Sequence, residues 1–113
     1  MFKKTNPGGH IEVIEGVYLK TLVYGDRTLM TKVKFDKGAV IPLHSHPHEQ
    51  TGVIVSGKMN FQVNGEHQIV EPGDSWNIAG GMEHGATALE ESVVIEVFSP
   101  VRDDYLPYYT AED

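Results

Sequence analysis

Residues 38–57 read GAVIPLHSHPHEQTGVIVSG and contain three of the six histidines of the chain, His44, His46 and His48. Side chains alternate between the two faces of a β-strand, so every second residue from 44 to 50 would point the same way if one strand ran through them. Two imidazoles on the same side can bind one ion, and Gln50 would return to that side as a further ligand. The proline before His48 can bend the chain, which leaves the direction of His48 open.

A further histidine lies far along the chain, in residues 73–88, which read GDSWNIAGGMEHGATA. This distant imidazole favours a metal site over a chance H-x-H pair, because the two stretches together supply three imidazole ligands. Glu49, brought inward by a local bulge, is the alternative to Gln50 as the oxygen ligand. Neutral ligands leave an ion its Lewis acidity and open positions for a substrate. We therefore expect one divalent ion (nickel, zinc, iron or manganese) bound by His44, His46, Gln50 and His84.

Short runs rich in Val, Ile, Thr, Phe and Tyr surround both stretches, and glycines and prolines interrupt nearly every window of helical length. The sequence therefore predicts strands and no helix. The expected strands are 17–24, 29–35, 40–46, 50–56, 58–63, 66–70, 74–78, 85–88 and 92–98. Asn64-Gly65 predicts a type I′ hairpin, and Ser56-Gly57 and Pro72-Gly73 predict two further reversals. Many short strands at regular spacing favour an all-β sandwich or closed barrel.

The length of 113 residues predicts a single domain, 1–113, and we see no internal repeat or linker. Residues 1–10 have the composition of a loose lead-in. Residues 99–113 contain Pro100, Pro107 and three tyrosines, so we expect this C-terminal segment to cover the barrel without forming a strand. A polar-aromatic tail of this kind could contribute to a subunit contact.

The formal net charge is −7 and lysines and arginines form no cluster longer than Lys3-Lys4, which argues against nucleic acid and anionic membranes as partners. A small anionic substrate is the expected partner, bound where the site carries its own positive charge. The chain has no cysteine, which excludes disulfides, thiolate metal ligands and a cysteine nucleophile. No apolar run follows the N-terminal lysines and none approaches the ~20 residues of a membrane helix, so a cytoplasmic location is expected.

The two histidine stretches resemble the paired motifs of the cupin family. Residues 38–57 match the first motif and residues 73–88 the second, with a short hairpin between them. Gln50 stands where the family usually has a Glu ligand, Ala79 where it usually has Pro, and Ala88 where it has Asn. The resemblance implies a single-domain cupin, a double-stranded β-helix or jelly-roll barrel, that holds one metal ion. It also implies a homodimer, because small cupins commonly dimerise through their sheet edges.

A narrower resemblance comes from residues 95–105, which read IEVFSPVRDDY and look like the tail of a small cupin of pectin and alginate degradation. That family converts 4,5-unsaturated monouronates, the end products of polysaccharide lyases, into linear keto-uronates. Its functional acid, usually Asp, aligns with Glu96, and its Phe and Arg align with Phe98 and Arg102. The resemblance implies a metal-dependent enzyme with isomerase-like or tautomerase-like chemistry.

The residues make chemical sense in those roles, although each also has a simpler explanation. Glu96 and Phe98 share strand parity, so both can face one cavity, where the carboxylate could move a proton. Arg102 could hold a substrate carboxylate through paired hydrogen bonds. Alternatively, Glu96 faces solvent, Phe98 is core packing, and Arg102 pairs with a nearby aspartate or a carboxylate across a dimer interface.

Two further residues are candidates for the substrate pocket. His48 could lie beside a ligating imidazole or be exposed, and Trp76 could pack in the core or line the cavity. Two other functions compete with the uronate enzyme. An Fe(II) dioxygenase could use the same histidines, although a neutral Gln ligand stabilises oxidised iron less than Glu would. A non-catalytic module that binds a small ligand is the third possibility.

Overall fold

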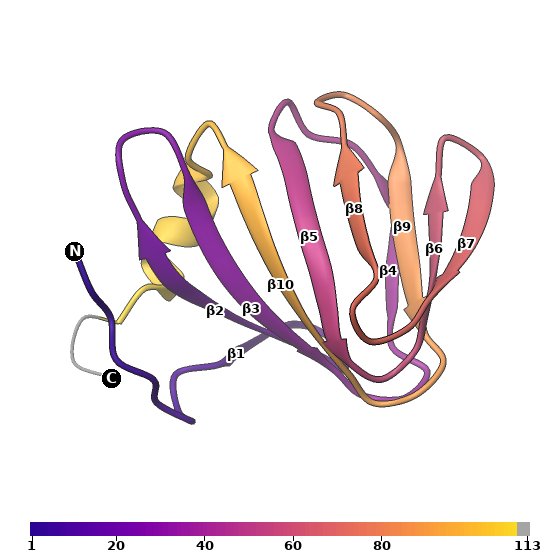
Figure 1. Ribbon diagram of the computed structural model, residues 1–113, viewed down its shortest axis with the longest axis horizontal. Helices are drawn as coiled ribbons and strands as arrows, with labels where there is room; N and C mark the ends of the chain where they lie inside the picture. Colours follow the sequence, from indigo (N-terminus) through magenta and orange to yellow (C-terminus); the bar gives the residue numbers. More distant parts are fainter. Residues whose placement is uncertain (111–113) are drawn as a thin grey trace.

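Two antiparallel sheets face each other in the computed structural model, which describes residues 1–110 (Figure 1). The larger sheet has the strand order β1 (Ile11–Ile14), β2 (Val17–Tyr24), β3 (Leu29–Phe35), β10 (Ser92–Ser99), β5 (Glu49–Ser56), β8 (Ser75–Ile78). The smaller sheet has the order β4 (Val40–His44), β9 (His84–Ala88), β6 (Met59–Val63), β7 (Glu66–Val70). This arrangement confirms the predicted all-β jelly-roll barrel. Among the described residues, no helix is long and apolar enough to cross a membrane.

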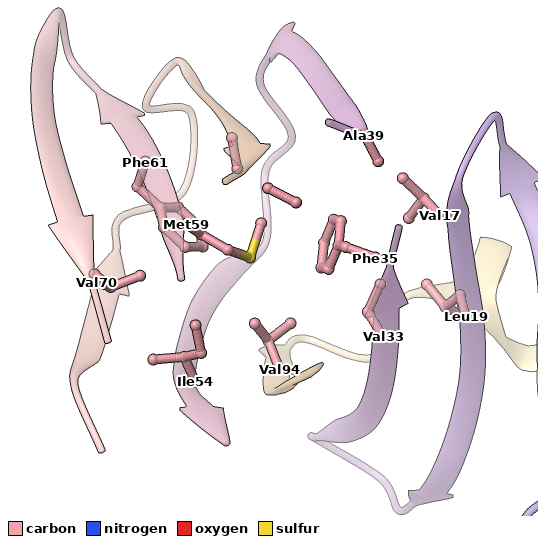
Figure 2. Close-up of a cluster of buried hydrophobic side chains, with 12 residues drawn as sticks. Val17, Leu19, Val33, Phe35, Ala39, Ile54, Met59, Phe61, Val70 and Val94 are labelled. Carbon is pink, nitrogen blue, oxygen red and sulfur yellow. The ribbon is translucent and has the colours of Figure 1, made fainter. Parts of the chain in front are cut away.

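Alternating side chains form the core between the sheets. In β3 and β10 every second residue is buried, as strand geometry requires when only one face meets the core. Figure 2 shows the resulting apolar cluster, in which Met59 of the smaller sheet points toward Phe35 of the larger one. Along β5 and β10 the inward positions include the apolar Ile54 and Val94 and, further toward one end, the polar Gln50 and the charged Glu96. The apolar core therefore fills one part of the barrel and leaves a polar part beside it.

Backbone turns occur where the sequence predicts them. Asn64 and Gly65 both have positive φ, 50° and 82°, as a type I′ hairpin between β6 and β7 requires. Gly57 and Gly73 also have positive φ, 91° and 94°, at the two other reversals. At Gly57 space is restricted too, because a Cβ there would lie 2.2 Å from the carbonyl oxygen of Glu91.

The strand prediction is wrong at the first motif. The expected strand 40–46 ends at His44, and the expected strand 50–56 begins one residue earlier, at Glu49. Residues 45–48 are outside the strands because the chain crosses here from the smaller sheet to the larger one. The assumption that residues 44 to 50 share one strand face is therefore wrong, and another geometry must bring the histidines together.

Two elements were not expected. Strand β1 (Ile11–Ile14) pairs with β2 at the edge of the larger sheet, and its apolar residues Ile11 and Ile14 are exposed. The C-terminal segment forms a short 3₁₀ helix, η1 (Asp103–Tyr108), which lies beside β2 (Figure 1). The Thr21 hydroxyl donates a hydrogen bond to the Tyr105 carbonyl oxygen at 2.6 Å and fixes this contact. Residues 111–113 of the predicted cover segment lie outside the described residues.

Candidate metal centre

Three histidines from three different places in the fold converge at the polar end of the barrel. His44 ends β4, His46 lies in the connection to β5, and His84 begins β9. His44 and His84 are paired in register across the two strands, and their rings are 4.4 Å apart. One potential ligand atom from each of the three residues lies within 4.8 Å of the others. The group can hold a metal ion.

Backbone carbonyls set the tautomers of two of these imidazoles. His44 Nδ1 lies 2.9 Å from the Pro42 carbonyl oxygen, and His84 Nδ1 lies 2.8 Å from the Met82 carbonyl oxygen. A carbonyl oxygen only accepts hydrogen bonds, so both Nδ1 atoms carry the hydrogen and both Nε2 atoms keep a lone pair. His84 Nε2 is buried and has no hydrogen-bond partner within residues 1–110. A buried lone pair without a partner fits a metal ligand.

Gln50 faces the histidine group from β5. Its Oε1 lies 3.0 Å from His46 Nε2. Two ligand atoms about 2.1 Å from one ion and at right angles to each other would be about 3.0 Å apart, so this spacing also fits joint coordination. Glu49, the alternative ligand, is exposed and accepts a hydrogen bond from Asn77 at 3.0 Å. The bulge that this alternative required is absent at Glu49, which pairs in continuous register with Ser99 of β10.

The surroundings keep two of the imidazoles in the neutral form that binds metals. Burial, with a smaller contribution from the charge of Arg102, lowers the pKa of His46 to about 4. Burial also lowers the pKa of His84, although the hydrogen bond to Met82 opposes the shift. Both residues therefore stay neutral at pH values where an ordinary histidine takes up a proton.

Glu96 points into the barrel from β10 and is only 8% exposed. Its Oε2 accepts hydrogen bonds from Gln50 Nε2 and, at 2.9 Å, from Trp76 Nε1. Burial raises the pKa of Glu96, and these two hydrogen bonds reduce the shift because they stabilise the carboxylate. The alternative of a solvent-facing Glu96 is therefore wrong.

Arg102 and Phe98 lie at the same cavity as Glu96. The Arg102 guanidinium stacks 3.9 Å from the centre of the Tyr105 ring and 5.0 Å from that of Phe98. It also donates to both carboxylate oxygens of Asp104, from Nε at 3.1 Å and from Nη2 at 2.7 Å. The hydrogen bonds from Arg102 lower the pKa of Asp104. The alternative in which Arg102 pairs with a nearby aspartate is therefore present, and the guanidinium also borders the cavity.

A cavity of about 70 Å³ joins most of these side chains. The predicted site residues that line it are His44, Gln50, His84, Glu96, Phe98 and Arg102. Tyr105 also lines it, and sequence reasoning assigned that residue only to barrel cover or a subunit contact. Its position three residues after Arg102 could have indicated this, because one turn of the 3₁₀ helix η1 brings Tyr105 to the same side as Arg102.

The other two predicted pocket residues lie around this cavity. His48 is half-buried, and its ring is 5.6 Å from that of His46. Trp76 is half-buried, stacks 4.4 Å from the Phe61 ring, and borders a separate groove of about 500 Å³ lined by residues of β6, β7 and β8. Trp76 reaches the polar cavity through its hydrogen bond to Glu96.

Comparisons with known proteins identify the family to which this fold and histidine cluster belong. Residues 31–98 match the family described as the cupin domain. The pectin degradation protein KdgF of Dickeya dadantii (strain 3937) is 35% identical over 97 residues, which covers 84% of this chain and 88% of that protein.

Solved structures extend the likeness to three dimensions. The structure of KdgF from Halomonas sp. has 36% identity and a TM-score of 0.89, and the match covers 94% of this chain and 98% of that one. An RmlC-like cupin from Shewanella frigidimarina NCIMB 400 has 29% identity and a TM-score of 0.83, with 86% and 87% covered. The chain therefore belongs to the cupin family and is a small single-domain cupin similar to the pectin degradation protein KdgF.

Proposed function

We propose that this protein is a metal-dependent enzyme that converts 4,5-unsaturated monouronates into linear keto-uronates during pectin or alginate breakdown. The observation that carries the proposal is one small cavity bordered by three kinds of group: potential metal ligands, the buried carboxyl of Glu96 and the guanidinium of Arg102. The likeness to two KdgF proteins over most of the chain supports the substrate class.

The metal-binding residues of the proposal are His44, His46, Gln50 and His84. Imidazole and neutral amide ligands suit nickel, zinc, iron and manganese, and the site does not select one of them by donor type. A bound divalent ion would act as a Lewis acid toward the oxygen atoms of the substrate.

Glu96 is the group that moves the proton. The reaction is an isomerisation: the hemiacetal hydroxyl on C1 gives up its proton, the bond from C1 to the ring oxygen breaks to leave an aldehyde at C1, and the ring oxygen takes up a proton to become an enol hydroxyl on C5. The enol proton is then lost and a proton is added to C4, which leaves a ketone at C5. Burial raises the pKa of Glu96, which makes its carboxylate a stronger proton acceptor than that of an exposed glutamate.

Arg102 binds the substrate carboxylate. Asp104 uses the Nε and one Nη2 hydrogen of the guanidinium and holds its plane, which leaves the remaining donors for a ligand. Phe98 stacks beneath the guanidinium and forms an apolar wall, and His48 stands beside His46 at the edge of the site. A positively charged group beside an otherwise apolar wall suits a small anionic sugar.

The test is a time course of the ultraviolet absorbance of an unsaturated monouronate, with purified protein before and after chelation. The proposal expects loss of the conjugated C4=C5 absorbance, abolished by the chelator and restored by added divalent metal. An unchanged absorbance with metal-loaded protein would overturn it. An oxygen electrode in the same reaction distinguishes the alternative dioxygenase, because the isomerisation consumes no O₂.

A cytoplasmic location and a homodimer complete the proposal. Val55 and Ile69 are about half exposed, at 54% and 49%, and apolar residues of this kind are available for a subunit contact. Light scattering of the purified protein tests the dimer, which a monomer mass would contradict.

A further inference from the structure

Trp76, Gly52 and Glu96 form one row across the larger sheet. Gly52 of β5 is paired in register with Trp76 of β8 on one side and with Glu96 of β10 on the other. Neighbouring strands are about 4.8 Å apart, so the backbones of Trp76 and Glu96 are separated by roughly 10 Å. Their side chains nevertheless meet, because the indole crosses over β5 to reach the carboxylate.

Gly52 makes this crossing possible. A Cβ at position 52 would lie 2.6 Å from two atoms of the indole ring and 2.7 Å from a third. Side-chain carbon atoms do not approach so closely, so any other residue at position 52 would displace the ring. The requirement is one of space, and the Phe61 ring also packs against the indole, with the two ring centres 4.4 Å apart.

The indole N–H of Trp76 donates to the same oxygen of Glu96 as the Gln50 amide does. Trp76 Nε1 and Gln50 Nε2 both donate to Glu96 Oε2. Two donors from different strands fix the rotation of a carboxylate that a single bond would leave free to turn. Glu96 is one methylene longer than Asp and therefore has one more torsion to restrain.

We propose that Trp76, seated over Gly52, is a positioning residue that holds the Glu96 carboxylate against Gln50 and does not itself contact substrate. The cavity of about 70 Å³ is lined by Glu96 and Gln50 but not by Trp76. Trp76 instead borders the separate groove lined by residues of β6, β7 and β8. This inference rests on the proposed function for its kinetic consequences, whereas the contact itself can be tested without turnover.

The kinetic test compares Trp76→Phe and Gly52→Ala with the wild-type protein on an unsaturated monouronate. Trp76→Phe keeps an aromatic ring near Phe61 but removes the N–H donor together with part of the ring volume, and Gly52→Ala keeps the indole but displaces it. Both should lower kcat about 10-fold, as loss of one hydrogen bond to a charged group would, with KM within about twofold of wild type. Gly25→Ala is the matched control, because nothing lies within 4 Å of its added Cβ, and it should leave kcat unchanged.

A double-mutant cycle separates positioning from general structural damage. In a Glu96→Gln background, Trp76→Phe should produce little further loss, because the carboxylate that it positions is already absent. An equal loss in both backgrounds would overturn the proposal and indicate that the indole serves only packing. A raised KM with unchanged kcat would also overturn it and place Trp76 in contact with substrate.

Fluorescence provides a readout that needs no substrate, because Trp76 is the only tryptophan of the chain. Glu96→Gln should change the intensity or wavelength of the emission, whereas Asp26→Asn, an exposed loop carboxylate, should not. Identical emission in wild type and Glu96→Gln would overturn the inference whatever the activity. Absence of uronate turnover by the wild type, together with the emission change, would count against the proposed function alone.

Discussion

Gln50 faces two different groups with the two ends of its amide. Its Oε1 lies beside His46 Nε2, and its Nε2 donates to the Glu96 carboxylate. A glutamate could supply the oxygen but not the N–H, and it would bring a second negative charge against a buried carboxylate. The N–H that Gln50 donates to its neighbour on β10 therefore gives a structural reason for a Gln at a position where the cupin motif predicts Glu.

Replacement of Gln50 by Glu should therefore separate metal binding from activity. The charged ligand keeps or strengthens metal binding, but repulsion between residues 50 and 96 forces one of them to hold a proton. We expect metal content near that of wild type and turnover of the monouronate lowered at least about 10-fold. Metal analysis and the absorbance assay on the same sample test this, and wild-type turnover by the variant would contradict it.

Arg102 depends on Asp104 for its orientation. Its side chain is only 12% exposed whereas that of Asp104 is 57% exposed, so the pair is held at the cavity edge. Asp104→Ala should raise KM for the monouronate about threefold to 10-fold with a smaller change in kcat, because the guanidinium loses its fixed plane. Asp103→Ala, an exposed neighbour, is the control. Equal KM values for the two variants would contradict this role of Asp104.

The bounds of several strands could be predicted from the sequence, whereas the path of the connection between β4 and β5 could not. Strands 17–24 and 29–35 are predicted with their true bounds, because branched and aromatic residues and flanking turn residues mark them locally. The His-x-His pair also led to the correct cluster, although through a wrong geometry, since residues 45–48 leave the strand. The sheet to which each histidine belongs depends on pairing between strands that are distant in the sequence. The pattern of neighbouring residues does not predict such pairing.

The same limit applies to residues that act across strands. The inward direction of Glu96 follows from the register of β10 between β3 and β5, which alternation along a single strand left undecided. The contact of Trp76 with Glu96 needs Gly52 between them, and a glycine within a predicted strand gave no indication of which ring fills its space. Strand β1 was missed because its isoleucines are exposed at an edge and because, within residues 1–110, β1 pairs with β2 alone.

Two glycine turns give a matched test of how the hairpins are stabilised. Gly65→Ala must adopt a φ near 82° but meets no other atom within 4 Å, so it should lower the free energy of unfolding by about 1 kcal/mol. Gly57→Ala has the same backbone strain and also a contact of 2.2 Å with the Glu91 carbonyl oxygen, so we expect a loss of about 3 kcal/mol or more. Urea denaturation measures both, and equal losses would contradict a role for close packing at Gly57.

At the scale of the whole molecule, the polar end of the barrel makes stability depend on pH. The pKa of His46 is lowered from 6.5 to about 4, so the unfolded chain takes up a proton below pH 6.5 that the folded protein does not. The unfolded state then binds more protons, and the free energy of unfolding of protein prepared without metal should fall as the pH drops from 6.5 toward 4. His46→Gln should show a shallower decline over this range. Parallel curves for the two proteins would contradict the lowered pKa.

All the chemistry proposed for this barrel depends on one divalent ion among His44, His46, Gln50 and His84. The most direct measurement is an anomalous difference map from crystals grown with nickel or zinc, recorded at the absorption edge of that metal. We predict one strong peak about 2.0–2.3 Å from an imidazole nitrogen of each histidine and from Gln50 Oε1. A map without a peak there, or with its main peak bound to other residues, would contradict the account.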